Sequence, residues 1–197
     1  MKRNTESIEK LIIAFGSLGG VGKKTAMRYA YKIVDMSLQE VKEFCDALMT
    51  VKERVRYCNN CATFCENDLC DICQNRKSNI VCVVSYPRDV LSIERAGGYS
   101  GLYHVLHGTI SPIDGRGPDQ LRIKELLARL KDGNIHEVIV ATNPDIEGDV
   151  TAMYIAKLLK PFDIKVSRIA QGISIGSDIE FVDETTLSRA IDNRIQI

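Results

Sequence analysis

The sequence predicts an α/β protein with a mainly parallel sheet, preceded by a small helical domain and a cysteine-rich loop and followed by a C-terminal tail. Three observations predict this order. Apolar residues recur at helical spacing between Ile8 and Ala47, two Cys-x2-Cys pairs follow, and short apolar runs then alternate with helical segments from Ile80 onward. Such alternation is typical of parallel sheets that carry helices on both faces.

The overall charge excludes a protein whose net charge alone would attract it to nucleic acid or to an anionic membrane. The 197 residues include 26 Lys and Arg and 26 Asp and Glu, so the formal net charge is zero. Any contact with a polyanion must therefore be local. No apolar run is long enough to span a membrane, and Met1 is not followed by an apolar signal segment, so we expect a cytoplasmic protein without a membrane partner.

The N-terminal region, residues 1–56, is predicted to be a helix-hairpin-helix domain. Its helices flank the turn Gly19-Gly20-Val21-Gly22, after which the run from Lys23 to Val34 keeps helical periodicity. Ser37 precedes a further helix that we expect to extend through Leu48. Glu40, three residues after Ser37, predicts a capping box at its start.

The glycine turn resembles a nucleotide-binding P-loop, but its register differs. A P-loop requires Gly, four residues, Gly-Lys and then Ser or Thr. Ser17 occupies the position of the first glycine, and Lys24 stands where the hydroxyl residue is needed. Nucleotide binding at this turn is therefore disfavoured.

A phosphate-binding hairpin fits the same residues better. Gly20 and Gly22 let backbone N–H groups approach a phosphate at the start of a helix, where Lys23, Lys24 and Arg28 add positive charge. Lys24 and Arg28 are four residues apart and share one helical face. Such a grip on the backbone would bind single- or double-stranded DNA without sequence preference. The alternative is an ordinary glycine-rich turn with solvated lysines.

The loop 57–77 carries the strongest chemical signal. Cys58-x2-Cys61 and Cys70-x2-Cys73, separated by eight residues, provide four thiolates for a tetrahedral zinc ion. Four protein ligands leave no open position, so the zinc is expected to be structural and to fold a loop that has little core of its own. Free thiols or a redox pair are the alternative, which two such pairs at this spacing disfavour.

The three remaining cysteines are not counted among the predicted zinc ligands. Cys65 lies between the two pairs and could compete as a ligand, but it has no Cys-x2-Cys partner. Cys45 and Cys82 lie in apolar runs, so both are predicted to be core residues.

The α/β unit is predicted over residues 78–170. Ile80–Val84 is a continuous apolar run typical of a buried parallel strand. The further strands expected are 102–106, 137–141 and 165–169, and the helices expected are 88–95, 117–130 and 148–159. The tail, 171–197, has no obvious place in this sheet.

Acidic residues follow two of the predicted strands. Asp89 comes after the first strand, and Glu147 and Asp149 come after the strand that ends at Ala141, at the carboxyl edge where α/β sites form. Their carboxylates can form a weak magnesium site or a partner site, since hard cations prefer oxygen ligands. The alternative is that they cap helices and compensate helix dipoles.

Taken in order, these motifs resemble those of one family over essentially the whole chain. They are the hairpin 18–28, the four-cysteine cluster and the segments 87–90, 101–106 and 141–156. The chain resembles the RecR family of recombination proteins. The resemblance implies a helix-hairpin-helix domain, a four-cysteine zinc finger, a Toprim domain as the parallel sheet, and a C-terminal assembly segment with a Walker B-like stretch, Ile179–Asp183.

The resemblance also implies a function in recombinational DNA repair. Family members are expected to form ring-shaped homotetramers that encircle DNA, and to act with RecO and RecF to load RecA at single-stranded gaps, without catalysis of their own. By this resemblance Lys24 and Arg28 correspond to DNA-contacting positions and the four paired cysteines to the zinc ligands. The location implied is the nucleoid within the cytoplasm.

The sequence departs from the family pattern at several positions. Gly19 stands where the family hairpin usually has proline, and Gln171 stands where the family generally has arginine. Ser85 ends the first Toprim strand, where Toprim enzymes place a glutamate for acid–base chemistry. The alternative function, a magnesium-dependent Toprim phosphoryl-transfer enzyme acting on nucleic acid, is disfavoured by Ser85.

Overall fold

A computed structural model describes residues 4–131 and 133–195. The chain divides into two compact units that meet in sequence between Val55 and Arg56, and each is described by itself. In the part of the chain that the structure describes, no helix is both long enough and apolar enough to cross a membrane.

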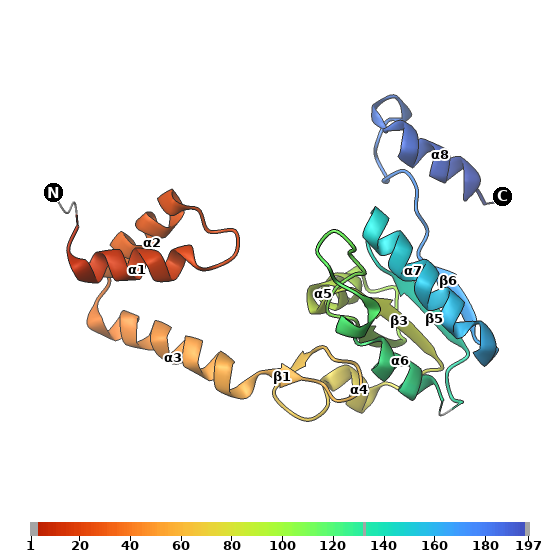
Figure 1. Cartoon of the computed structure of the whole chain (residues 1–197), viewed down its shortest axis with the longest axis horizontal. Coiled ribbons are helices and arrows are strands. Elements are labelled where there is room, and N and C mark those ends of the chain that lie inside the picture. Colours follow the sequence, from red (N-terminus) through yellow and green to blue (C-terminus); the bar gives the residue numbers. More distant parts are fainter. Residues whose placement is uncertain (1–3, 132, 196–197) are drawn as a thin grey trace. The chain divides into compact units, whose positions relative to one another are not determined.

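The first unit consists of α1 (Glu6–Gly16), α2 (Lys23–Asp35) and α3 (Leu38–Arg54), coloured red to orange in Figure 1. Helices α1 and α2 pack against each other across the glycine turn. Ala26 and Ala30 of α2 are fully buried, because small side chains let the two helices approach closely. The Phe15 and Tyr29 rings meet edge to face, with centroids 5.6 Å apart. The predicted helix-hairpin-helix is confirmed.

Helix α3 begins at the predicted capping box. The Ser37 N–H donates to the Glu40 carboxylate at 2.7 Å, and the Glu40 N–H donates to the Ser37 hydroxyl at 3.3 Å. The helix continues to Arg54, beyond the Leu48 that periodicity indicated. The prediction that Cys45 is a core residue was wrong, because α3 buries none of its residues and Cys45 is exposed.

The second unit opens with a two-stranded hairpin and a short helix. β1 (Arg56–Tyr57) pairs antiparallel with β2 (Phe64–Cys65), and α4 (Asp71–Asn75) follows. This small element has a buried centre of its own, made of cysteine side chains.

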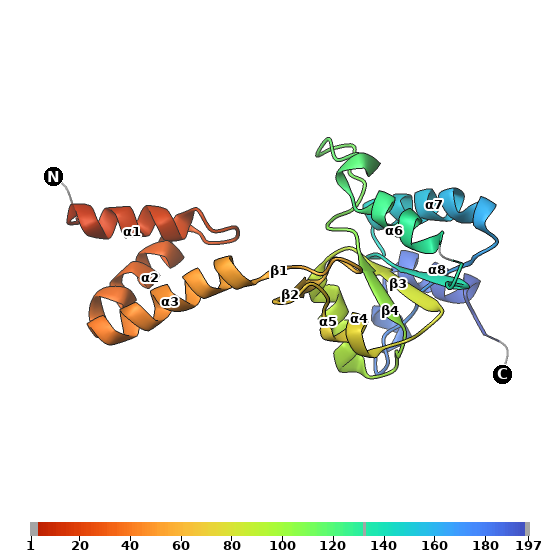
Figure 2. The same cartoon turned by 90° about the horizontal axis from the view of Figure 1, so that it is seen from below.

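The main sheet is parallel throughout. Its strands are β3 (Ile80–Val84), β4 (Leu102–Val105), β5 (Glu137–Ala141) and β6 (Lys165–Arg168), in the order β4-β3-β5-β6. Figure 2 shows α6 (Ile123–Leu130) and α7 (Ile146–Leu159) over one face and α5 (Pro87–Ala96) over the other. The predicted parallel sheet with helices on both faces is confirmed.

The apolar core lies on both faces of this sheet. One cluster joins alternate residues of β3 and β5, including Val81, Val83 and Val138, to the buried faces of α6 and α7. A second joins the opposite faces of β3 and β4 to Val90 of α5. Because side chains alternate along a strand, the two central strands β3 and β5 contribute to both clusters, as their nearly continuous apolar sequences require.

The single helix predicted over 117–130 is interrupted. A 3-10 turn, η1 (Pro118–Gln120), is followed by an extended Leu121 and only then by α6. Leu121 is buried in the core, and the Arg122 N–H donates to the Leu106 carbonyl at 3.1 Å. These tertiary contacts hold the backbone extended at a position where the local sequence alone favours helix.

The C-terminal tail stays outside the sheet, as expected; a 3-10 turn, η2 (Lys160–Phe162), and β6 precede it. The tail contains the 3-10 turn η3 (Ile179–Phe181) and α8 (Glu184–Asp192), a helix that the sequence did not predict. Asp183 caps α8 by accepting from the Thr186 N–H at 2.9 Å. The stretch Ile179–Asp183 is therefore a turn and a helix cap.

Candidate metal centre and nucleic-acid interface

Four cysteines converge at the centre of the small hairpin element. The Sγ atoms of Cys58, Cys61, Cys70 and Cys73 all lie within 4.8 Å of one another. Backbone N–H groups point at two of them: the Cys70 N–H donates to Cys58 Sγ at 3.3 Å, and the Cys73 N–H donates to Cys70 Sγ at 3.5 Å. Four sulfur ligands at this separation match a closed tetrahedral zinc site.

The surroundings of the cluster shift the pKa values of three of its thiols. Burial raises the pKa of Cys70 to about 12, and a hydrogen bond with Cys73 together with burial raises the pKa of Cys61. Burial also raises the pKa of Cys58, but hydrogen bonds from the N–H groups of Cys61 and Cys70 outweigh this effect and lower the pKa to about 7. A divalent cation would stabilise four thiolates at this place, and these residues fit zinc.

Cys65 packs against this cluster but is not one of its four converging residues. Cys65 Sγ donates to the Asn67 carbonyl at 2.9 Å. Cys82 is buried within β3, which confirms its predicted place in the core.

Two hydrogen bonds join the cysteine cluster to the end of β4 and to the residues that follow it. The Val105 N–H donates to the Cys61 carbonyl at 2.8 Å, and His107 Nε2 donates to the Ala62 carbonyl at 2.7 Å. A metal ion bound by Cys61 is therefore connected to the sheet through these two hydrogen bonds.

A partly buried ion pair makes a second connection. Arg76, just after α4, binds Glu94 of α5 through both terminal nitrogens, at 2.9 and 2.6 Å. The Tyr103 hydroxyl of β4 donates to the same carboxylate at 2.6 Å. These bonds hold the pKa of Glu94 below its ordinary value, with the Arg76 hydrogen bond as the main cause.

The glycine turn of the first unit gathers the five predicted DNA-contacting residues. Gly20 adopts φ +81°, which favours glycine, and Gly22 is the N-cap of α2. A Cβ at either position would meet no atom within 4 Å, so both face open space. Lys23, Lys24 and Arg28 are all exposed on the first turns of α2, which carry no acidic residue.

The three predicted acidic residues at the sheet edge have separate roles. Asp89 accepts from the Tyr86 N–H at 2.7 Å and so caps α5, while Glu147 accepts from the Thr109 hydroxyl at 2.8 Å. Asp149 forms ion pairs with Arg168 and Arg189. Within residues 4–131 and 133–195, the four cysteines are the only group of three or more potential metal ligands that converges.

Four family models match successive parts of the chain. They are the RecR helix-hairpin-helix (residues 8–52), the RecR four-cysteine zinc finger domain (55–75), the Toprim domain (79–170) and the RecR C-terminal domain (172–195). The Recombination protein RecR of two strains of Clostridium perfringens is 51% identical over 193 residues, which cover 97% of this chain and 97% of each relative.

The chain belongs to the RecR family of recombination proteins. Membership of the RecR family assigns it to recombinational DNA repair and supports DNA binding through the helix-hairpin-helix. The family's zinc finger covers the segment in which the four sulfur atoms converge, so the structural cofactor is zinc.

Sequence reasoning missed two arginines at the edge of the Toprim sheet. Asp149 Oδ1 lies 2.5 Å from Arg168 Nη1, and its Oδ2 lies 2.8 Å from Arg189 Nη2 of α8. Although burial raises the pKa of Asp149, these two arginines hold it below its ordinary value overall. No local pattern indicates Arg189 as a partner of Asp149, because it lies 40 residues further along the chain, in a helix that the sequence does not predict.

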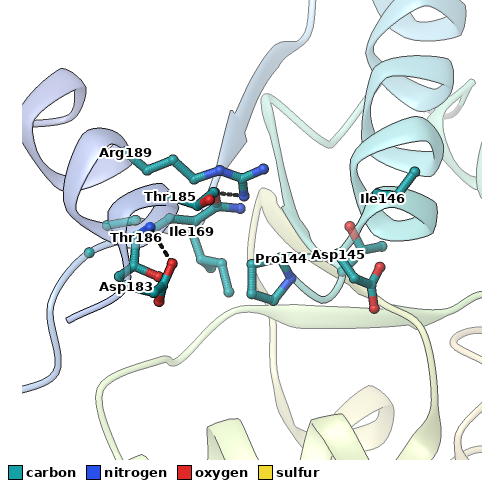
Figure 3. Close-up of a pocket in the computed structure, with 12 residues that line it drawn as sticks. Pro144, Asp145, Ile146, Ile169, Asp183, Thr185, Thr186 and Arg189 are labelled. Atoms are coloured by element: carbon teal, nitrogen blue, oxygen red, sulfur yellow. Dashed lines mark hydrogen bonds between the residues drawn. The ribbon is translucent and has the colours of Figure 1, made fainter. Parts of the chain in front are cut away.

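The same contact borders a cavity of about 560 Å³. Figure 3 shows Pro144, Asp145 and Ile146 of the Toprim edge on one side of it, with Asp183 and Arg189 of the C-terminal segment on the other. The RecR C-terminal segment therefore faces the carboxyl end of the Toprim sheet across this cavity and is joined to it by the Arg189–Asp149 ion pair, at the position where sites form in α/β folds.

Proposed function

We propose that this chain is a DNA clamp of recombinational repair. It forms a ring-shaped homotetramer that encloses DNA, and it acts with RecO and RecF to load RecA at single-stranded gaps. The observation that carries the proposal is the open, basic glycine turn, in which Gly20, Gly22, Lys23, Lys24 and Arg28 lie together at the start of α2.

The turn is suited to phosphate rather than to bases. The first N–H groups of α2 receive no side-chain cap and no acidic residue, so the positive end of the helix dipole remains available to an anion. Lys24 and Arg28 add two charges on one face. Contacts of this kind position a protein on single- or double-stranded DNA and do not read its sequence.

Exposed apolar side chains at both ends of the chain support assembly into a ring. On α3, Leu38 is 86% exposed, and Leu48 and Val51 are also well exposed. In the C-terminal segment, Ile175 and Phe181 are exposed as well. Two separate apolar surfaces let each subunit contact two neighbours, which is what a closed homotetramer with two interfaces requires.

A non-catalytic Toprim domain fits the sheet edge. Ser85 directly follows β3 and is fully buried, and Asp149 is already paired with Arg168 and Arg189. A magnesium ion at Asp89, Glu147 and Asp149 would have to displace these hydrogen bonds and ion pairs, so we expect binding there to be weak. The edge therefore serves partner and subunit contacts.

The test combines light-scattering mass with a salt-titrated DNA-binding assay on the zinc-loaded protein. Lys24→Ala/Arg28→Ala is compared with Lys10→Ala/Lys32→Ala, which removes the same charge from exposed positions elsewhere on α1 and α2. We expect a tetrameric mass, and a slope of log affinity against log salt that falls by about two in the hairpin variant alone. A monomeric mass, or equal binding by the two variants, would overturn the proposal.

A further inference from the structure

Three flat groups form a column beside the zinc finger. The Tyr57 and Phe64 rings stack with centroids 5.6 Å apart and planes 19° apart. The Arg122 guanidinium carbon lies 5.0 Å from the centre of the Tyr57 ring, and the His107 ring meets its edge at 4.4 Å. Tyr57 is therefore held in one orientation from three sides.

Arg122 is itself fixed by the sheet. Its N–H donates to the Leu106 carbonyl at 3.1 Å, and its own carbonyl accepts from His104 Nε2 at 2.7 Å. The column is thus anchored to β4 at one end. Its other end is Phe64.

Phe64 is the member of the column that the fold does not explain. Its ring is 56% exposed, and among the described residues it belongs to none of the three buried apolar clusters. The register pairs it with Tyr57, but an aliphatic side chain would also fill that cross-strand position. Since the metal folds the finger, an exposed aromatic ring is not needed for its stability.

We propose that the column binds an unpaired base of single-stranded DNA, which stacks on the ring of Phe64. This inference rests on the proposed function and adds to it a preference for single strands. Aromatic rings accept any unpaired base, because every base has a π-face, whereas bases in a duplex are already stacked. The glycine turn would then hold phosphates and the finger would detect unpaired bases.

The surroundings of the column supply polar groups but no excess of positive charge. Beside Tyr57, a cavity of about 330 Å³ is lined by Asn59, Asn60 and Arg122, whose amides and guanidinium can bind a phosphate or a base edge. Glu125 lies 3.3 Å from Arg122 and offsets its charge. The cavity next to Phe64 is lined by Glu66, Asp71 and Glu94 and by no basic residue, so it does not attract phosphates.

The lack of excess positive charge gives the site a distinguishing property. Binding to phosphates releases counterions and weakens steeply with salt, whereas stacking does not. The part of the affinity that depends on bases should therefore change little with salt concentration. The part of the affinity that depends on Lys24 and Arg28 should fall as the salt concentration rises.

The test measures fluorescence anisotropy with the full-length, zinc-loaded chain. The probes are a single-stranded oligothymidylate, an abasic strand of the same length and a duplex of the same length. Phe64→Ala should weaken oligothymidylate binding about ten-fold and leave the other two probes unchanged. Phe64→Tyr, which keeps a flat ring, should bind as the wild type does.

Phe64→Leu separates stacking of a base on Phe64 from packing of Phe64 against Tyr57 in the β1–β2 pair. Leucine keeps an apolar contact with Tyr57 but offers no flat face, so this variant should lose as much oligothymidylate affinity as Phe64→Ala. Zinc content and thermal midpoint check that the finger remains folded. Wild-type binding by Phe64→Leu, or equal wild-type affinity for the abasic strand and oligothymidylate, would overturn the inference.

The variant of the glycine turn, Lys24→Ala/Arg28→Ala, separates this inference from the proposed function. It should weaken binding of all three probes. If it does so while Phe64→Ala and Phe64→Leu match the wild type, the clamp stands and the stacking site is overturned. If only Phe64→Ala and Phe64→Leu lose affinity, the stacking site stands and the grip of the glycine turn is overturned.

Discussion

The guanidinium of Arg189 lies 2.8 Å from the carboxylate of Asp149 and joins α8 to the first turn of α7. Arg189 also donates to the Gln171 side chain at 2.7 Å. Asp149 resembled a magnesium ligand in the sequence. In the structure it anchors the C-terminal segment to the Toprim sheet.

Removing this anchor should loosen the C-terminal segment without unfolding the sheet. We expect Arg189→Ala to increase amide hydrogen exchange across residues 171–195 by several-fold, since a partly exposed charged hydrogen bond contributes about 1 kcal/mol. The matched control is Arg194→Ala, because the Arg194 side chain bonds only to a carbonyl within its own turn. Equal exchange in the two variants would contradict an anchoring role for Asp149.

The zinc site should distinguish Cys70 from the nearby Cys65. Cys70→Ser removes one sulfur from the cluster, and we expect loss of bound zinc, measured by metal analysis, with proteolytic cleavage within 57–77. Cys65→Ser should retain zinc, because Cys65 lies outside the cluster and bonds to Asn67. Zinc loss in both variants, or in neither, would show that the ligand set is different.

Gly148 should be essential to the start of α7. A Cβ at this position would lie 2.0 Å from the Asn143 carbonyl oxygen, in the turn that leads from β5. We expect Gly148→Ala to lower the free energy of unfolding by about 3 kcal/mol, because the backbone must shift to make room. Gly117→Ala is the control, since a Cβ there meets nothing within 4 Å. Denaturant unfolding that gives equal values for the two variants would contradict this account of the turn.

His104 should make stability fall in mild acid. Burial lowers its pKa to about 4, whereas an unfolded histidine titrates at about 6.5. Above the unfolded pKa both states are neutral; as the pH falls from there, only the unfolded state gains a proton. Stability should therefore drop by up to about 3 kcal/mol between these two values and then level off.

The histidine effect is measured as the difference between the wild type and His104→Gln. Glutamine can still donate to the Arg122 carbonyl but does not titrate in this range, so its unfolding free energy should depend less on pH. His136→Gln, at an exposed position, should keep the wild-type dependence. The same slope in all three proteins would exclude His104 as the cause.

The sequence predicted best the features that depend on neighbouring residues. Ile80–Val84 was recognised as a buried strand because every residue in it is apolar, and the capping box needed only Ser37 and Glu40. The four-cysteine cluster was predictable from two short pairs, whose spacing limits how far the thiols can separate.

The features that were missed depend on contacts distant in sequence. Cys45 lies in an apolar run, but whether that run is buried depends on what α3 packs against. The break at Leu121 follows from the hydrogen bond that the Arg122 N–H donates to the Leu106 carbonyl, and the role of Asp149 follows from Arg189. No local pattern contains these partners, so composition and periodicity could not reveal them.

The measurement that tests the clamp most directly compares retention on circular and linear DNA. The zinc-loaded protein is bound to a closed circular duplex at low salt, challenged with high salt, and measured before and after the circle is cut once. A ring that encloses DNA should remain on the circle in high salt, which removes phosphate contacts, and should leave when the cut provides an end. Equal loss from the circular and the linear form would contradict enclosure and show that the protein binds DNA only from one side.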